Sequence, residues 1–395
     1  MKNSNQKMAA VVALMAVMSL AMCFIIMGAI SVELMDSLKM DAGKFGTLIL
    51  GLFLTSCIVQ LFIGPLVDKV GYKPVAFIGF SVISISFLLL SIATTFTSAF
   101  IASVLLGVGA MAVNTVGNTL IPVVLFEGKD PARASNLGNG FYGIGYILTP
   151  LLMVFMLNNL ELSYKVSLLI LAGLMLLFLI FSLFATYPKV STGFEFKQIF
   201  NVLKKPAVII AAIALFCYVA LEVSMSTWIR SLMDELYITD GSIGSSAKTG
   251  IVLSLFGVAM MTGRFITSSI KNLTAIGARL IVIMSVLSLV AIFIMIIAKS
   301  PVLGIVAVIM AGLAFAPLFP TIVGITFSRF EPGLYGTVFG IIFAVGLLGG
   351  TFVPNYVGQL SVGSSVQQSL IIPAIMAGLL IIVSLILGRI VKSKE

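Results

Sequence analysis

Twelve apolar runs, each of about 20 residues, recur along the 395-residue chain and are separated by short polar breaks. A helix of about 20 residues spans the ~30 Å hydrocarbon core of a bilayer. The sequence therefore predicts an all-α membrane protein with twelve transmembrane helices. The runs lie near residues 8–32, 44–66, 74–95, 98–125, 135–157, 164–187, 207–232, 248–269, 278–298, 302–327, 335–359 and 367–389.

The composition argues against a soluble enzyme. Hydrophobic residues make up 60% of the chain and charged residues 9%, whereas a soluble domain carries roughly 25% charged residues. Histidine is absent, which removes the commonest general base and metal ligand. Cys23, Cys57 and Cys217 lie within apolar runs and show no metal-binding spacing. We therefore expect no enzyme activity, no cofactor and no metal site.

The longest polar interruption divides the chain into two sets of six helices. It spans residues 188–205 and contains five charged side chains. The predicted organisation is an N-terminal bundle over 1–187, a cytoplasmic linker over 188–205 and a C-terminal bundle over 206–395. A twelve-helix fold with discontinuous helices is the alternative at this stage.

The basic residues predict the orientation. If both termini are cytoplasmic, seventeen of the 23 Lys and Arg residues fall in inner segments and six in outer segments, as the positive-inside rule requires. The net charge of +9 is then a topology signal and indicates no nucleic-acid partner. We expect a multi-pass protein of the inner membrane, surrounded by lipid and monomeric.

The loop after the second apolar run carries a motif, GPLVDKVGYK, that begins at Gly64. It resembles the loop pattern G-x-L-a-D-r-x-G-r-k of the major facilitator superfamily. The residues that fall on pattern positions are Gly64, Leu66, Asp68, Lys69, Gly71 and Lys73.

Each of these residues has a physical role to play in such a loop. Gly64 lets two helices approach and Gly71 permits a turn, while Asp68 could lie at a neighbouring helix N-terminus, which stabilises a carboxylate by about 0.3–1 kcal/mol. We interpret the loop as a latch that stabilises one conformation of the carrier, the alternative being an ordinary basic loop. Gly263 and Arg264, followed by Lys271 and Arg279, form a degenerate second copy.

Three further stretches resemble the fucose/glucose/galactose permease branch of that superfamily. They are residues 107–150, the segment FCYVALEVSMSTWI from Phe216, and PLFPTI from Pro317. The resemblance implies the 6+6 pseudo-symmetric major facilitator fold and sugar symport by alternating access. Asn114 departs from the branch, because fucose permeases have a Glu at that position.

Glu222 is the one acidic residue that falls inside an apolar run. A charge at such depth costs about 2.5–3.5 kcal/mol, so it should face a cavity or a partner. We place it in the outer half of the seventh helix, where it could accept sugar hydroxyl groups, bind a cation or take up a proton. It is the candidate for coupling to H⁺ or Na⁺; the alternative is a structural carboxylate paired with Arg264.

Two amides stand in register in the fourth helix. Asn114 and Asn118 share one helix face at i, i+4 spacing, and Asn139 and Tyr142 are placed at the start of the fifth helix. Amides offer a donor and an acceptor together, which suits a neutral polyol. Hydrogen bonds between helices, worth about 0.6 kcal/mol each on average, are the alternative for these residues.

Five further residues each allow two interpretations. Gln60 could line a cavity or bond a neighbouring helix, and Trp228 could stack on a sugar or anchor the membrane interface. Phe319 and Pro320 predict a kink with an aromatic gate, or a static kink. Arg264 could belong to the inner gate or anchor one helix end.

These features predict a secondary active transporter of a small hydroxylated solute, a sugar or sugar derivative, that works by alternating access. Two alternatives stay open. One is an efflux transporter of lipophilic or amphipathic compounds, which the 29 Phe and 20 Met residues would suit. The other is a membrane sensor that binds its ligand without moving it.

Overall fold

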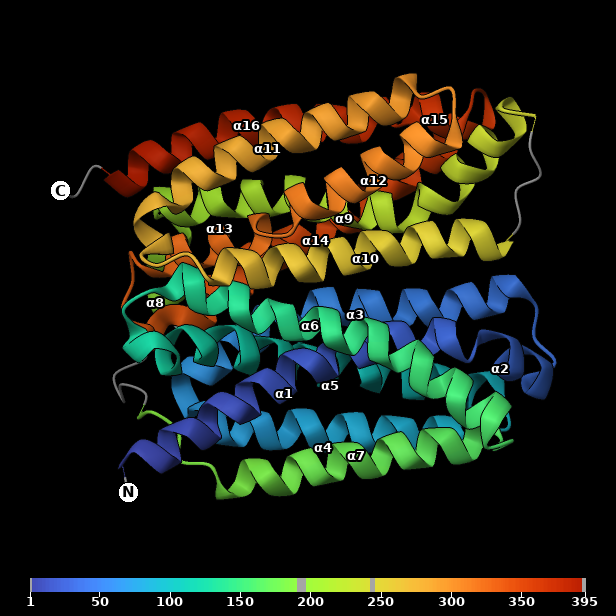
Figure 1. Cartoon of the computed structure of the whole chain (residues 1–395). Helices are drawn as coiled ribbons and strands as arrows, with labels where there is room; N and C mark the ends of the chain where they lie inside the picture. The colour runs from blue at the N-terminus through green and yellow to red at the C-terminus, as the bar shows by residue number, and fades with distance from the viewer. Residues whose placement is uncertain (1, 190–196, 242–245, 393–395) are drawn as a thin grey trace. The chain divides into compact units, whose positions relative to one another are not determined.

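The computed structural model describes residues 2–189, 197–241 and 246–392, and within these residues all regular structure is helical (Figure 1). The long helices of the first half and their short neighbour are α1 (Lys2–Ala29), α2 (Ser31–Leu38), α3 (Ala42–Val70), α4 (Tyr72–Ser91), α5 (Phe96–Val124), α6 (Pro131–Val154) and α7 (Tyr164–Phe184). The helices of the second half are α8 (Lys197–Leu203), α9 (Pro206–Thr239), α10 (Ser246–Ser268), α11 (Leu273–Ile297), α12 (Pro301–Phe315), α13 (Leu318–Phe327), α14 (Tyr335–Val362), α15 (Val366–Ser369) and α16 (Ile371–Lys392).

Side chains at the helix starts explain where several helices begin. The Asp41 carboxylate accepts a hydrogen bond from the backbone N–H of Lys44 at the start of α3, and Thr95 forms a capping box with Ser98 at the start of α5. Such caps satisfy N–H groups that have no partner within the helix. Gly71, at φ 87°, ends α3 and begins α4, a conformation that favours glycine.

The described residues contain twelve helical stretches long and apolar enough to cross a membrane. This confirms the predicted all-α fold with twelve transmembrane helices. The bounds agree with the apolar runs except in the seventh span, which continues to Thr239. Asp234 and Glu235 lie in this extension; their charge ends the apolar run, but both residue types are compatible with a helix.

Contacts between Cα atoms divide the chain into two units that do not follow the sequence halves. The first unit consists of Met1–Gly128, Phe141–Ile199 and Pro332–Gly340, and the second of Lys129–Gly140, Phe200–Glu331 and Ile341–Glu395. The beginning of α6 thus groups with the second unit and the beginning of α14 with the first. Of the predicted linker, residues 190–196 lie outside the described part of the chain.

One helix forms the centre of each unit. In the first unit α5 packs against α1, α3 and α4, and α4 lies beside α7 (Figure 1). In the second unit α9 packs against α10, α12, α13 and α16. The candidate functional side chains of each unit lie mainly on these central helices and their direct neighbours.

Candidate functional site

A partly buried ion pair joins α9 and α10 in the second unit. The Oε1 atom of Glu222 on α9 lies 3.5 Å from Nη2 of Arg264 on α10, and the two side chains are 24% and 4% exposed. Because a lone charge within a membrane span is costly, the pairing explains how both side chains are accommodated. Glu222 therefore has the partner that the sequence left as one of two interpretations.

Arg264 connects four segments of the second unit. Its Nη2 donates to the Tyr218 hydroxyl at 3.2 Å, and its Nη1 donates to the backbone carbonyl of Asn139 on α6 at 3.3 Å. Its Nε donates to the carbonyl of Ala316, between α12 and α13, at 3.2 Å. The guanidinium group thus bonds to several segments and does more than anchor one helix end.

A proline explains why the Ala316 carbonyl is available. In an uninterrupted helix this carbonyl would accept a hydrogen bond from the N–H of residue 320. Pro320 has no N–H, and α12 ends at Phe315 while α13 begins at Leu318. The predicted break is present, and Arg264 supplies the hydrogen bond that the proline removes.

Aromatic rings lie next to Tyr218, which accepts a hydrogen bond from Arg264. The rings of Tyr218 and Phe319 are 6.0 Å apart, and those of Phe319 and Phe343 are 5.7 Å apart in an edge-to-face arrangement. Tyr218 is fully buried and Phe319 is 7% exposed. Apolar walls with a few polar groups are typical of ligand sites.

Glu222 lies at the middle of its helix rather than in the outer half. It is the seventeenth of the 34 residues of α9. Its place within the helix differs from the sequence-based expectation because the helix continues beyond the end of the apolar run, to Thr239.

The amides of the first unit bond one another. Asn118 Nδ2 donates to Asn114 Oδ1 at 2.8 Å, and Asn114 Nδ2 donates to Gln60 Oε1 at 3.3 Å. Gln60 Nε2 in turn donates to the Thr115 hydroxyl at 3.2 Å. Asn114 and Gln60 are fully buried and Asn118 is 3% exposed. The network ties α3 to α5, which is one of the two interpretations that the sequence left open.

Asn139 and Tyr142 lie on α6, and Trp228 lies on α9. Asn139 and Tyr142 lie well inside α6, which begins at Pro131, and not at its start. Asn139 groups with the second unit and Tyr142, whose ring is 6.4 Å from that of Tyr146, with the first. The Trp228 indole donates to the carbonyl of Pro354 at 3.0 Å and packs against α14.

Asp68 lies at the N-terminus of α14, inside the first unit. Its two carboxylate oxygens accept hydrogen bonds from the backbone N–H groups of Gly336 at 2.9 Å and Thr337 at 2.6 Å. A Cβ atom on Gly64 would collide with the Gly336 carbonyl, so glycine is required for this approach. The motif thus places a carboxylate at a helix N-terminus in the way its spacing predicts.

The basic residues of the motif lie apart from this contact. Lys73 donates through Nζ to the carbonyl of Leu183 near the end of α7, at 2.7 Å. Lys69 is exposed on the surface of the first unit. Both lysines therefore lie at the ends of helices, whereas Asp68 and Gly64 form the buried part of the motif.

Asp130 makes a similar contact that the sequence analysis missed. Its carboxylate accepts from the backbone N–H groups of Leu273 and Thr274 at the start of α11, both at 2.9 Å, and from the Thr274 hydroxyl at 2.7 Å. It also accepts from the N–H of Arg133 at 3.3 Å. Asp before Pro131 signals the start of its own helix, but nothing local in the sequence indicates that it also caps α11.

Comparisons with known proteins agree with this architecture. A family model described as Major Facilitator Superfamily matches residues 12–354. The chromaffin granule amine transporter of Rattus norvegicus is 26% identical over 257 residues, which cover 63% of this chain and 49% of that relative. The chain therefore spans about half the length of the curated relative that it matches.

Two solved structures share the fold over nearly their whole length. The E. coli fucose:proton symporter FucP has a TM-score of 0.77 at 16% sequence identity, covering 96% of this chain and 99% of that chain. The human organic anion transporter MFSD10 (TETRAN) has a TM-score of 0.73 at 14% identity, again covering 96% and 99%. Identities this low show the fold alone.

Proposed function

The chain belongs to the major facilitator superfamily, a family of membrane transporters and not of enzymes, and from this premise we propose that it moves a small hydroxylated solute, a sugar or sugar derivative, by alternating access. The two halves of such a transporter expose one site to each side of the membrane in turn. The similarity in fold to a fucose:proton symporter supports a sugar.

The observation that carries the proposal is the Glu222–Arg264 pair in the second unit. Both side chains are placed where a charge is expensive. The guanidinium group is also held by Tyr218 and by the carbonyls of Asn139 and Ala316. Binding of a solute or an ion could change the pairing of Glu222 with Arg264, so this site is suited to transport.

The same pair favours H⁺ over Na⁺ as the coupling cation. A proton needs only to bind the Glu222 carboxylate, after which Arg264 keeps its other three acceptors. Na⁺ would need several oxygen ligands around it, and the positively charged Arg264 at 3.5 Å opposes its approach. Asn114 holds the position of the Glu of the fucose permeases, which leaves Glu222 as the carboxyl group for coupling.

We assign the remaining site residues by their exposure. The buried network of Gln60, Asn114 and Asn118 supports a role in holding α3 on α5. In the second unit, direct solute contact then falls to Glu222, while Phe319 and Pro320 lie on the segment that Arg264 bonds; in the first unit, the half-buried Tyr142 is the candidate. Asp68 and Asp130 would stabilise one conformation through the helix ends that they cap.

The orientation belongs to the same proposal. The excess of Lys and Arg in alternate loops supports cytoplasmic termini and insertion in the inner membrane. The Asp68 and Asp130 contacts then lie at the cytoplasmic ends of their helices.

A second candidate is export of an amphipathic amine. The Glu222 carboxylate could attract an ammonium group by its charge, and the faces of the Tyr218, Phe319 and Phe343 rings could contact it. The curated relative reported above is an amine transporter. Arg264 argues against this candidate, because it already compensates the charge of Glu222.

Counterflow in proteoliposomes tests the proposal. Vesicles loaded with unlabelled hexose should take up labelled hexose transiently through the protein, and empty vesicles should not. Uptake of a labelled aromatic amine alone would favour the exporter instead. Saturable hexose binding without exchange would indicate a sensor and would contradict transport.

A further inference from the structure

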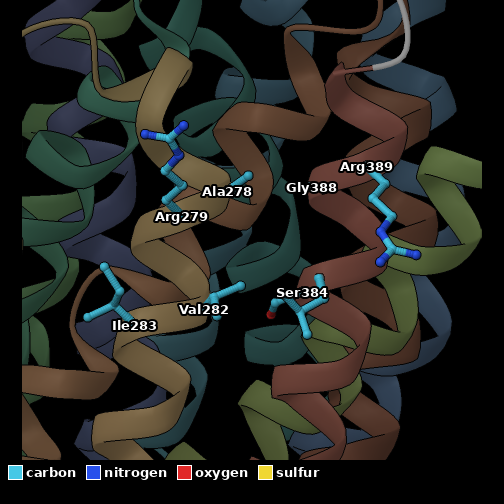
Figure 2. Close-up of a pocket in the computed structure, with 8 residues that line it drawn as sticks. Ala278, Arg279, Val282, Ile283, Ser384, Gly388 and Arg389 are labelled. Carbon is cyan, nitrogen blue, oxygen red and sulfur yellow. The ribbon is translucent and has the colours of Figure 1, made fainter.

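A groove between α11 and α16 lies on the surface of the second unit. Neither Glu222 nor Arg264 lines it. It encloses a cavity of about 410 Å³. The two helices run side by side (Figure 1), and Figure 2 shows Arg279 and Val282 on one wall with Ser384 and Arg389 on the other. No element of the proposed transport site contributes to this groove.

Two arginines give the groove an uncompensated positive charge. Arg279 and Arg389 are both exposed, and neither α11 nor α16 contains an Asp or Glu. Within the described part of the chain, neither guanidinium group forms a salt bridge or a hydrogen bond. The groove therefore attracts an anion, and none of the described residues supplies one.

The rest of the groove is apolar and exposed. Ile283 and Leu385 are 54% and 51% exposed, and both belong to membrane-spanning segments, so hydrocarbon chains can contact them. Close to these side chains, the Ser384 hydroxyl is buried to 1% exposure and has no hydrogen-bond partner among the described residues. Figure 2 shows it pointing towards α11. A buried hydroxyl without a protein partner is available to donate to a ligand atom.

We propose that this groove binds an anionic glycerophospholipid. The phosphate would lie at the end of the groove that Arg279 and Arg389 flank, where Figure 2 shows their guanidinium groups on opposite sides. One acyl chain would lie along Val282, Ile283 and Leu385, and the Ser384 hydroxyl would donate to an ester oxygen of the lipid. Basic pockets between transmembrane helices are suited to anionic headgroups. A soluble anion would use the arginines but leave the apolar walls uncovered, so the lipid accounts for more of the groove.

Native mass spectrometry of the purified full chain tests the proposal. The protein is titrated with phosphatidylglycerol or with phosphatidylcholine of the same acyl chains, and the retained lipid is counted. We expect one phosphatidylglycerol to be retained selectively. The double variant Arg279→Gln/Arg389→Gln should lower its affinity roughly 30-fold, because each arginine is expected to raise the affinity for an anionic lipid about fivefold and the two effects multiply.

Matched variants separate the groove from general charge. Lys204→Gln/Lys205→Gln removes the same charge from two exposed residues outside the groove and should leave retention unchanged. Val282→Phe fills the groove but keeps both arginines, and should lower retention. Millimolar glycerol 3-phosphate should not displace the lipid.

Four results would overturn the proposal. They are equal retention of phosphatidylcholine, unchanged retention in the double arginine variant, equal loss in the lysine variant, and displacement by glycerol 3-phosphate, which would indicate a site for a free phosphate. A cooperative melting transition in each variant establishes that a loss of lipid is not a loss of fold.

Discussion

At the scale of single residues, the second unit contains a backbone carbonyl that lacks its usual helical donor, because the donor position is occupied by a proline. Pro320 cannot donate to the Ala316 carbonyl, and Arg264 does so at 3.2 Å. The same guanidinium group reaches Tyr218, Glu222 and the Asn139 carbonyl. One side chain therefore joins α6, α9, α10 and the α12–α13 break.

This arrangement predicts an energetic coupling between positions 264 and 320. In a Glu222→Gln background, which avoids an unpaired carboxylate, Arg264→Gln should destabilise the protein because it leaves buried carbonyls without donors. Adding Pro320→Ala provides an N–H that can bond Ala316. The cost of Arg264→Gln should then fall by about 1 kcal/mol.

Thermal midpoints of the four proteins in detergent measure this coupling. A smaller difference between Arg and Gln at position 264 in the Pro320→Ala pair is the expected result. Equal differences in the two backgrounds would show that Arg264 does not replace the missing N–H.

The sequence predicted some of these residues better than others. Glu222 stands out because it is a lone acid in an apolar run, and Arg264 could be named as its partner because basic residues are rare at that depth. Asp130 was missed, since its local pattern describes only the cap of its own helix. Long-range partners of this kind depend on packing, which one sequence does not specify.

At the scale of helices, carboxylates from other helices cap three N-termini. Asp68 caps α14, Asp130 caps α11, and Glu235 accepts from the N–H groups of Val366 at 2.7 Å and Gln367 at 2.9 Å at α15. The first N–H groups of a helix lack internal partners, and in a membrane protein water is scarce around them. Each of these caps therefore satisfies the first N–H groups of one helix and also connects that helix to another part of the chain.

The two motif copies differ in where the carboxylate comes from. In the first copy, Asp68 at the end of α3 reaches the start of α14. The degenerate second copy has no acid between α10 and Lys271, and Asp130 beside α6 reaches the start of α11 instead. Asn272, which precedes α11 in a left-handed conformation, forms no side-chain cap of its own. The loss of the motif in the second half is thus compensated from another helix.

Gly64 and Gly46 provide a matched test of the α3–α14 contact. A Cβ atom at position 64 would collide with backbone atoms of Gly336, whereas at position 46 on the same helix it would meet nothing within 4 Å. Gly64→Ala should destabilise the protein by about 1–3 kcal/mol through overpacking and slow exchange. Gly46→Ala should be neutral or stabilising by up to about 1 kcal/mol.

Thermal midpoints and hexose counterflow rates of the two variants check this prediction. Similar behaviour of Gly64→Ala and Gly46→Ala would contradict the close approach at Gly64. The apolar runs predicted which segments form helices. They did not predict this contact, because small residues indicate only that some other helix could approach.

At the scale of the whole molecule, each unit contains one segment from the opposite half of the sequence. Lys129–Gly140, which opens α6, packs in the second unit, and Pro332–Gly340, which opens α14, packs in the first. These are the segments that take part in the Asp130 and Asp68 contacts. The apolar runs could predict two sets of six helices, but they could not predict these exchanged segments, because the exchange depends on tertiary contacts.

Proton-driven accumulation in proteoliposomes tests the central claim most directly, namely that the protein is a solute carrier whose Glu222 carboxyl couples transport to H⁺. Under an inward pH gradient, vesicles with the unaltered protein should concentrate labelled hexose above the outside level, and a protonophore should abolish this. Vesicles with Glu222→Gln should still exchange hexose but only equilibrate it. Accumulation by Glu222→Gln equal to that of the unaltered protein, or accumulation that follows a Na⁺ gradient alone, would contradict the account.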